Sequence, residues 1–536
     1  MPERLYFDCN ASYGPRTGKH HEERWTLQHL LADMDLAGIA GALVCHAQSL
    51  EYDPMLANLQ LVEDIAPHRD RLFPCWTAVP DYCDDGPDPE TFLRLAREND
   101  VRAVRIAPAT FGVPARESAW CGLRDMLRQE QMPVLVSAAA LNNDFDAADR
   151  LLSIFKDCPV ILTDASWGDW RQVALLMHDH PHLHLEFSMF QGNRAVEWMA
   201  ERFGADRCLY GSGLPARAPG AARGFLDWTL LEDPDANAIA SGNLARLLKG
   251  AAPERIPAPA EWDDALTRAV RSGSPLPCPV LDNHCHVLHD GANNAGRIFV
   301  MPEGGIDGMI ELTRRIGIDT TAIMSWAGPL SGDTDRGNDI VANALARYPD
   351  ELLGVPTIRP ELQTDAEMQT VIDRFHTKLR CPGLKPFPRA PLNFDDPGFD
   401  LWFRYANEHH LYMVFDPATQ GPAGTPVVEH LVKNYPNITL SLDHCGKSWP
   451  YAKWAVEMCN RFPQVFAQLN YTLVTNGIIE YIVQHAGADR VLFGTDAPMR
   501  DPRPQASWLV FTRLPEEAKR LVFGGNFQRI LKRCFP

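Results

Sequence analysis

The sequence predicts an α/β protein built from two tandem (β/α)8 (TIM) barrels. The chain has 536 residues, more than a single hydrophobic core normally serves. Short apolar runs followed by longer helical patterns recur along it, as in parallel sheets that helices cover on both faces. The order of these units repeats after about 280 residues, which indicates an internal duplication.

In the first half, eight apolar runs are predicted as strands. They lie at residues 5–11, 40–47, 72–79, 101–108, 133–140, 160–167, 183–190 and 207–215. Eight β–α units within about 250 residues are the signature of a (β/α)8 barrel. We therefore assign residues 1–250 to a first barrel.

A stretch rich in proline and alanine follows, and we assign residues 251–275 to a linker. It is expected to hold one short helix, Glu261–Arg271. The second half again supplies eight predicted strands, at residues 280–286, 320–327, 352–358, 382–388, 411–418, 438–446, 465–472 and 490–498. Residues 276–536 are therefore expected to form a second barrel.

Matching segments favour a duplication over a strand rhythm that any two barrels share. Residues 207–215 match 490–498, and residues 241–250 match 524–533, at nearly the same offset. A third pair, around Asp164 and Asp443, also aligns. The agreement of separate segments indicates that a whole domain was copied.

Composition narrows the class of protein. Apolar residues make up 45% and charged residues 22%, as in folded globular proteins. The net charge of −18 disfavours nucleic acids and anionic membranes as partners. Thirteen scattered cysteines suit a reducing compartment, and neither a signal-peptide pattern nor an apolar run of about 20 residues is present. We expect a cytoplasmic protein whose partners include neither nucleic acid nor a membrane.

The strand ends of the second half gather groups suited to chemistry. In barrels of this type the site lies at the carboxyl ends of the strands. These ends carry His284, His286, Lys385, Asp416, His444 and Asp496. Alternation along a strand directs His284 and His286 into the barrel. Two imidazoles with carboxylates from other strands predict a divalent metal site of the kind zinc favours, which activates water near neutral pH.

These residues stand in motifs that resemble those of the amidohydrolase superfamily. D-x-H-x-H spans Asp282–His286, D-H-x-G spans Asp443–Gly446, and G-T-D-x-P spans Gly494–Pro498. The nearest branch is the amidohydrolase-related (amidohydrolase 2) group, which contains non-oxidative decarboxylases, lactonases and simple hydrolases. The resemblance covers residues 281–536, including a G-N-x-x-R-I-L segment in the closing helix.

The resemblance implies one divalent metal, usually zinc, held by His284, His286 and Asp496. It also implies that His444 polarises the substrate or moves protons, and Asp496 is expected to accept a proton as well. Relatives usually place a histidine ligand on strand five, where this chain has Asp416. A carboxylate there either completes the site as a further ligand, with manganese as the alternative metal, or marks a metal-free relative such as a lactonase.

Three cationic residues on the same strand ends are predicted to bind substrate: Lys385, Arg389 and Arg500. A guanidinium fork suits a carboxylate, so a small organic acid fits them. For Lys385, a structural role or carboxylation to a bridging ligand are the alternatives. Asp443 is interpreted as a structural residue that faces away from the site.

The first half lacks the candidate ligands. Its matching positions hold Asn10, Ala11 and Ser12 for His284–His286, Ser137 for Asp416, Ala165 for His444 and Gly213 for Asp496. None of these residues is a strong zinc ligand at pH 7. We therefore expect a degenerate, metal-free copy that replaces a second subunit or binds a ligand of its own. The chain is then expected to be a monomer whose two fused halves form a pseudo-dimer, although a homodimer stays open.

The sequence thus predicts a metal-dependent enzyme whose active site lies in the second half. Its reaction is hydrolysis or non-oxidative decarboxylation of a small organic acid or lactone. A metal-free lactonase and a non-catalytic, small-molecule-binding pseudo-enzyme are the alternatives. Pocket shape depends on loops whose paths the sequence does not give, so the substrate stays open.

Overall fold

The computed structural model describes residues 3–17, 20–254, 257, 261–296, 299–388, 392–416, 421–472 and 474–536. The chain divides into two units. The first comprises Met1–Gln191, Ala195–Asp263 and Arg271–Gly273, and the second comprises Gly192–Arg194, Asp264–Val270 and Ser274–Pro536. The main change from one unit to the other falls between residues 263 and 274, within the stretch assigned to a linker.

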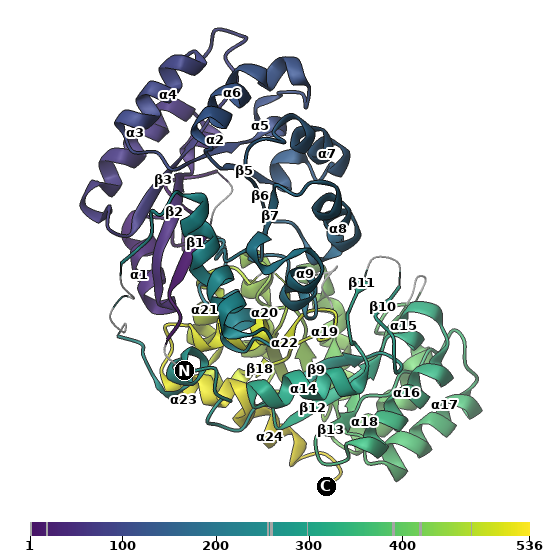
Figure 1. Cartoon of the computed structure of the whole chain (residues 1–536). Coiled ribbons are helices and arrows are strands. Elements are labelled where there is room, and N and C mark those ends of the chain that lie inside the picture. Colours follow the sequence, from purple (N-terminus) through teal and green to yellow (C-terminus); the bar gives the residue numbers. More distant parts are fainter. Residues whose placement is uncertain are drawn as a thin grey trace. The chain divides into compact units, whose positions relative to one another are not determined.

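The first unit contains one parallel sheet of eight strands in sequential order. The strands are β1 (Tyr6–Tyr13), β2 (Ile39–His46), β3 (Leu72–Thr77), β4 (Ala103–Ile106), β5 (Val134–Ser137), β6 (Val160–Thr163), β7 (Leu183–Glu186) and β8 (Cys208–Leu209). The segment after β8 returns to β1, since the backbone N–H of Cys9 donates to the carbonyl of Tyr210 over 3.0 Å. The sheet therefore nearly closes, which confirms a barrel in the first half (Figure 1).

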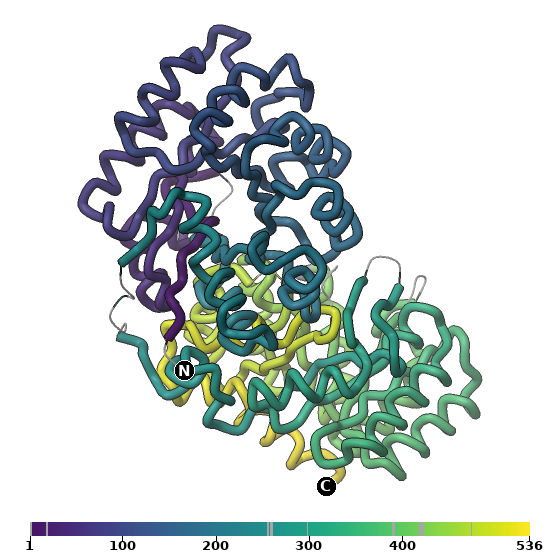
Figure 2. The backbone as a smooth tube through the Cα atoms, in the orientation of Figure 1, coloured from purple at the N-terminus to yellow at the C-terminus, as the bar shows by residue number. Residues whose placement is uncertain are grey.

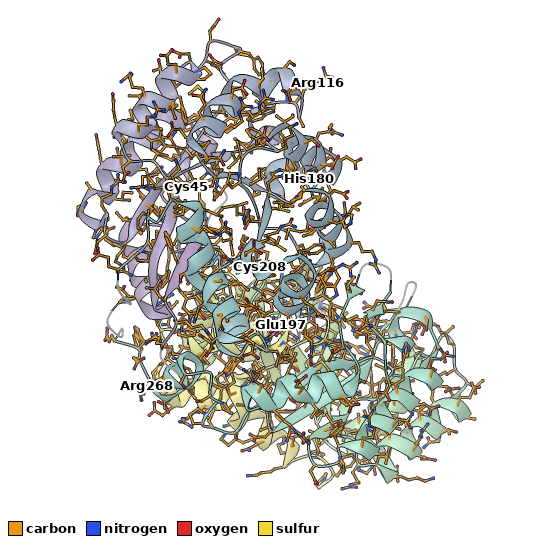
Figure 3. All side chains as sticks on the ribbon, viewed as in Figure 1. Cys45, Arg116, His180, Glu197, Cys208 and Arg268 are labelled. Carbon is orange, nitrogen blue, oxygen red and sulfur yellow. The ribbon has the colours of Figure 1, made fainter. Side chains whose placement is uncertain are left out.

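Helices surround these strands in the first unit (Figure 1). They are α1 (Leu27–Ala37), α2 (Gln48–Glu51), α3 (Pro54–Ile65), α4 (Pro89–Glu98), α5 (Pro108–Phe111), α6 (Glu117–Glu130), α7 (Phe145–Ile154), α8 (Trp170–Asp179), α9 (Ala195–Phe203), α10 (Arg223–Asp227), α11 (Asp233–Asn237) and α12 (Asn243–Leu247). Inside the sheet, Phe7, Leu43 and Leu135 belong to one buried cluster. Cys45 lies among the strands, whereas Arg116 lies in the outer layer (Figure 3).

The second unit contains eight parallel strands in two sheets among its described residues. One sheet joins β9 (Leu281–Val287), β12 (Thr320–Ser325) and β13 (Leu352–Gly354), and the other joins β14 (Gly383–Leu384), β15 (Tyr412–Phe415), β16 (Thr439–Leu442), β17 (Val465–Leu469) and β18 (Val491–Phe493). A separate antiparallel pair consists of β10 (Asn294–Ala295) and β11 (Phe299–Val300). The segment after β18 contacts β9, since the backbone N–H of Asp496 donates to the carbonyl of His284 over 2.8 Å.

Helices also cover the strands of the second unit (Figure 2). They are α13 (Ala265–Arg271), α14 (Ile306–Ile316), α15 (Ala327–Ser331), α16 (Thr334–Arg347), α17 (Asp365–Ile372), α18 (Asp400–Glu408), α19 (Thr425–Asn434), α20 (Trp449–Arg461), α21 (Ile478–Ala486), α22 (Pro502–Val510), α23 (Glu516–Arg520) and α24 (Asn526–Leu531). The helix predicted at Glu261–Arg271 begins later, at Ala265. No helix among the described residues combines the length and the apolar character needed to cross a membrane.

Each predicted strand overlaps an observed one, but the observed strands are mostly shorter. The run predicted at residues 382–388 contributes only Gly383–Leu384 to the sheet. Pro386 lacks the backbone N–H that a continued ladder requires, which is consistent with the early end of this strand. The polar strand ends therefore lie in irregular segments that lead out of the sheet.

The two units share a buried hydrogen-bond pattern at their first and last strands. Oδ1 of Asp282 accepts the backbone N–H groups of His284 and Thr495, each over 3.0 Å. Oδ1 of Asp8 likewise accepts the backbone N–H of the residue two positions later, over 2.8 Å, and that of Ser212, over 2.9 Å. Each aspartate therefore ties the start of its unit to the segment after the last strand.

A second pair of contacts also recurs in both units, at an offset of 280 residues. The side-chain amide of Asn58 donates to the carbonyl of Thr77 over 2.8 Å and accepts its N–H over 2.9 Å. The amide of Asn338 makes both contacts with Thr357, each over 2.9 Å. A buried asparagine thus joins a helix to the third strand end in both units.

The alignment of the sixth strands requires a correction. From the matched residues Cys208 and Val491, the registers of the last three strands of each unit align Leu162 with Leu442, and hence Asp164 with His444. These two residues also share left-handed backbone conformations, with φ of 57° and 60°. The predicted match of Ala165 with His444 is therefore wrong by one residue, because the sequence alignment paired Asp164 with Asp443 by identity.

Candidate metal centre and active site

Three buried side chains converge at the strand ends of the second unit: His284, His286 and Asp496. The Nε2 atoms of the two histidines are 3.2 Å apart, and Oδ1 of Asp496 lies 3.1 Å from Nε2 of His286 and 3.7 Å from Nε2 of His284. Two ligands each about 2.1 Å from a tetrahedral metal ion lie about 3.4 Å apart. The observed separations therefore fit three ligands on one cation.

The local backbone explains this convergence. His284 and His286 are two residues apart on β9, so their side chains share a face of the strand. Asp496 follows β18 in a left-handed conformation with φ of 55°, which is uncommon for a residue with a side chain. Its N–H is held by the carbonyl of His284, and the preceding Thr495 is held by Asp282. Asp496 is thus held in this conformation by contacts at its own N–H group and at the residue before it.

The opposite edge of the His284 ring contacts acceptors. Its Nδ1 atom lies 3.1 Å from the amide Nδ2 of Asn470, and it also lies 3.1 Å from Oδ1 of Asp443 and 3.2 Å from Oε1 of Gln468. These acceptors favour a proton on Nδ1, which leaves the lone pair of Nε2 directed at the ligand group. Burial lowers the pKa of His284 to about 4 and that of His286 well below its usual value. Both rings are therefore neutral, as metal binding requires.

Asp443 is a site residue, and its interpretation as a structural residue facing away is wrong. Its Oδ2 atom accepts from Nζ of Lys385 over 3.0 Å, while Oδ1 contacts His284. Burial raises the pKa of Asp443, but His284, His444 and Lys385 outweigh this effect and hold the pKa well below its usual value. Strict alternation fails here because His444 adopts a left-handed conformation, which lets both neighbours reach the site.

His444 is held by one ring nitrogen. Its Nδ1 atom lies 2.8 Å from Oδ1 of Asn470 and 3.4 Å from Oδ1 of Asp443. Its Nε2 atom has no hydrogen-bond partner within the part of the chain that the structure describes. Burial lowers the pKa of His444, and this effect outweighs that of the Asp443 carboxylate, which raises the pKa. The geometry leaves Nε2 available to exchange a proton with a bound molecule.

Arg500 pairs with the carboxylate of Asp496 through NH1. Its Nε atom donates to Oγ1 of Thr472 over 2.7 Å, and its guanidinium lies 4.8 Å from the ring centroid of Tyr471. Burial lowers the pKa of Arg500 to about 10, so it stays cationic at neutral pH. The pairing stabilises the ionised form of Asp496, which a metal ligand needs.

The remaining predicted residues are placed differently. Asp416 forms a second group with Asp443 and His444, and it is not part of the group of His284, His286 and Asp496. Its role as a metal ligand stays a prediction, as do the substrate-binding roles of Lys385 and Arg500. Arg389 lies outside the described residues.

Several contacting residues were not found from the sequence. The ring of His286 stacks on Trp326, with centroids 4.0 Å apart and planes inclined by 19°. Asn470 contacts both His444 and His284, and Gln468 contacts His284 and Asn283. The one signal in the sequence that could have indicated these residues is their position within or directly after strands β12 and β17.

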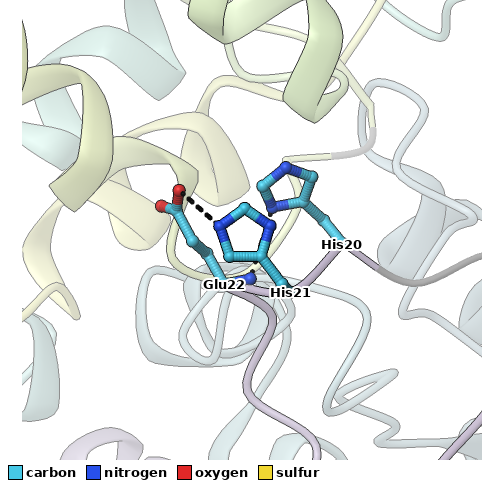
Figure 4. Close-up of side chains that lie close together, drawn as sticks. All are labelled: His20, His21 and Glu22. Carbon is cyan, nitrogen blue, oxygen red and sulfur yellow. Dashed lines mark hydrogen bonds and ion pairs between the residues drawn. The ribbon is translucent and has the colours of Figure 1, made fainter.

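A further group of possible metal ligands lies in the first unit, at His20, His21 and Glu22 (Figure 4). Nε2 of His21 is 3.4 Å from Oε1 of Glu22, and the backbone N–H of Glu22 donates to Nδ1 of His20 over 3.3 Å. His21 and Glu22 are exposed, and the three residues are consecutive. Solvent competes for such groups, so the buried cluster is the stronger candidate.

Comparison with known proteins now identifies the family. A model described as amidohydrolase matches residues 28–250 and 281–533, which is most of the chain. The chain belongs to the amidohydrolase family. It is accordingly an enzyme, either a hydrolase or a lyase. The family assignment agrees with the resemblance predicted from the histidine and aspartate motifs.

Amidohydrolase relatives of this chain include decarboxylases. It is 28% identical over 287 residues to gamma-resorcylate decarboxylase from Polaromonas sp. (strain JS666 / ATCC BAA-500), covering 44% of this chain and 86% of the relative. A solved 5-carboxyvanillate decarboxylase from Sphingomonas paucimobilis is 17% identical, with a TM-score of 0.37, over 48% of this chain and 99% of that one. A dihydroxybenzoic acid decarboxylase from Polaromonas sp. JS666, solved with bound manganese, is 16% identical, with a TM-score of 0.37, over 48% and 97%.

Proposed function

We propose that the second unit is a metal-dependent, non-oxidative decarboxylase of a small hydroxylated aromatic acid. The observation that carries the proposal is the convergence of His284, His286 and Asp496 within the spacing of a single cation. The 28% identical relative is named for the decarboxylation of such an acid. The adjacent groups supply what the reaction needs, namely cations for a carboxylate and a proton donor for carbon.

The residues present fit a divalent metal. Two neutral imidazoles and one ionised carboxylate form a donor set that zinc and manganese both accept. When bound, the metal supplies positive charge that polarises the oxygen atoms of the substrate. His284 and His286 would hold it through Nε2 and Asp496 through Oδ1, while Asp416 remains a candidate for a further ligand.

The protein's own groups then have distinct roles. Lys385 pairs with Asp443, and Arg500 pairs with Asp496. Both cations are proposed to orient the substrate carboxylate. The bond between the ring carbon and the carboxylate breaks, carbon dioxide leaves, and the electron pair stays on the ring carbon. His444 first takes up a proton at Nε2, which its burial opposes and Asp443 favours. It then donates this proton to the ring carbon and becomes neutral. Asn470 holds its other nitrogen during this transfer.

We further propose that the chain arose by tandem duplication and that the first unit is a degenerate copy. The repeated contacts of Asp8 and Asp282, and of Asn58 and Asn338, support this, as does the match of the family model to two segments. On this proposal the eight strands of the second unit complete a second barrel. The fused copy would then replace a second subunit, and light scattering of the purified chain tests for a monomer.

Activity assays on the full chain test the decarboxylase. Protein stripped with a chelator receives zinc or manganese, and 2,6-dihydroxybenzoate, 5-carboxyvanillate and a lactone are supplied in turn. We expect metal-dependent loss of carboxylate from an aromatic acid, abolished by His284→Ala. The matched control is His289→Ala, because His289 is an exposed histidine beyond the same strand. Lactone turnover alone, or activity without metal, would contradict the proposal.

A further inference from the structure

We infer that the strand ends of the first unit form a second binding site, which takes a small carboxylate anion. The inference goes beyond the proposed decarboxylase and does not rest on it. It comes from comparing the charged groups at equivalent strand ends of the two units. The first unit keeps both cations of the second unit and has lost the carboxylate that pairs with each.

The first of these cations is Arg105 on β4. Once Leu162 is aligned with Leu442, the registers of β4 to β6 and of β14 to β16 align Val104 with Leu384. Arg105 therefore matches Lys385, whose Nζ donates to Asp443 over 3.0 Å. The same register aligns the acidic partner, Asp443, with Thr163. The first unit therefore has an arginine where the second has Lys385, and a threonine hydroxyl where the second has the carboxylate of Asp443. The only side-chain hydrogen bond of Arg105 among the described residues runs from NH2 to Oδ1 of Asn10, over 3.2 Å.

The second cation is Arg217. In the second unit, Arg500 pairs with Asp496, four residues before it. The residue four before Arg217 is Gly213, which shares the left-handed conformation of Asp496, with φ of 70°. A Cβ atom at Gly213 would lie 2.6 Å from Cγ of Arg217. The arginine thus occupies the space that an aspartate side chain would need.

Both guanidinium groups keep unused hydrogen-bonding capacity. The Nε atoms of Arg105 and Arg217 are buried and have no hydrogen-bond partner in the described part of the chain. Neither side chain forms an ion pair with a described carboxylate, and NH2 of Arg217 contacts only Sδ of Met189, over 2.8 Å. A buried N–H group without a hydrogen-bond acceptor is unfavourable, and Nε with a terminal nitrogen is the fork that grips a carboxylate.

The neighbouring acids favour a monoanion over a dianion such as phosphate. Nδ2 of Asn10 lies 3.3 Å from Oδ1 of Asp164 and 3.3 Å from Oε1 of Glu186. Burial, followed by the charge of Asp164, raises the pKa of Glu186 to about 7. The charge of Asp164 acts on both guanidinium groups, and the charge of Glu186 acts on that of Arg217. A second charge on the ligand would be repelled by Asp164.

The first unit also has room for the body of such a ligand near these strand ends. A cavity of about 360 Å³ is lined by Thr77, by apolar side chains that include Val79, Phe92 and Phe111, and by the acidic residues Asp53 and Asp85. Thr77 is the register partner of Arg105, so the cavity lies one strand away from that arginine. Pockets that hold small organic ligands begin at about 300 Å³. A benzoate ring is well within this volume.

Calorimetric titration with benzoate tests the site in the metal-free full chain. Arg500→Met is introduced first, so that the corresponding cation of the second unit is absent. We expect about one equivalent of benzoate to bind, and adding Arg217→Met to weaken it at least tenfold. Arg94→Met, on the exposed face of α4, is the matched control and should bind as before. Equal binding with and without Arg217, or no binding at all, overturns the inference.

Two further arms keep the result decisive if Arg217→Met does not fold. Arg105→Met removes the other guanidinium group, and it should also weaken benzoate binding at least tenfold. Arg217→Lys keeps the charge but not the fork, and an intermediate affinity is expected. Near-ultraviolet circular dichroism verifies the fold of each variant. Tighter binding of inorganic phosphate than of benzoate would overturn the assignment to a carboxylate.

Discussion

The Nδ1 atom of His284 lies 3.1 Å from a carboxylate oxygen of Asp443, while Nε2 of the same ring lies 3.2 Å from Nε2 of His286. The carboxylate therefore fixes both the tautomer and the orientation of a candidate metal ligand. It also pairs with Lys385 and so joins the metal ligands to a cation that is proposed to contact substrate. Asp443 is thus the centre of the charge arrangement, although it is not in the three-ligand group.

Asp443→Asn should weaken metal binding by 10- to 100-fold, the usual effect of losing a partner of a ligating histidine. The amide is neutral and can present its NH2 to His284, which would place the proton on the wrong nitrogen. Competition titration of zinc against a chromophoric chelator measures the affinity. Asp350→Asn, on an exposed turn, is the matched control. Unchanged affinity in Asp443→Asn would show that this carboxylate does not act through His284.

Metal should stabilise the chain only while the ligand group is intact. A metal that binds the folded state at 100 times its dissociation constant adds about 2.7 kcal/mol to the free energy of unfolding. We expect zinc or manganese to raise a melting transition of the wild-type chain and to leave it unchanged in His286→Ala. Differential scanning calorimetry with and without chelator provides the measurement. An equal rise in His286→Ala would place the bound metal elsewhere, for example at His20 and His21.

The sequence predicted the convergence of three side chains better than it predicted their surroundings. His284, His286 and Asp496 come from motifs, and period-two alternation on a strand suffices to direct the histidines together. Asp443 was missed because alternation was applied through a position where His444 leaves the regular backbone, with φ of 60°. The contact with Trp326 depends on the path of the chain after β12, which no periodicity encodes. The alternation of strands and helices can be read from neighbouring residues. The contacts at a strand end join residues that are far apart in the sequence.

Thr495→Val should destabilise the second unit by about 1–3 kcal/mol, because the buried carboxylate of Asp282 would lose a hydroxyl donor. Two backbone N–H groups remain, so the aspartate is not left without partners. Thr495→Ser should retain most of the stability. Urea unfolding measures both variants against Thr370→Val, a threonine on the exposed face of α17. Equal losses in Thr495→Val and Thr495→Ser would assign the effect to packing.

Glu186 should make the stability of the first unit depend on pH. Its pKa of about 7 in the folded chain exceeds the ordinary value of 4.5, so the folded state binds more protons between these limits. The free energy of unfolding should therefore fall as pH rises from about 4.5 to 7, by an amount on the order of 3 kcal/mol. Glu186→Gln should flatten this part of the profile. Urea unfolding at pH 5 and pH 8 compares the two proteins, and an unchanged slope would refute the assignment.

His444→Gln separates proton transfer from metal binding. The amide of glutamine can reach toward Asn470 but cannot deliver a proton, so kcat should fall by 10²- to 10⁴-fold. The affinity for metal should change little, because Nε2 of His444 is not among the three converging ligand atoms. Steady-state decarboxylation and metal content are measured on the same preparation, with His289→Gln as the exposed control. Loss of metal together with activity would show that His444 is a metal ligand. An unchanged kcat would show that another group donates the proton, and Asp496 is the next candidate.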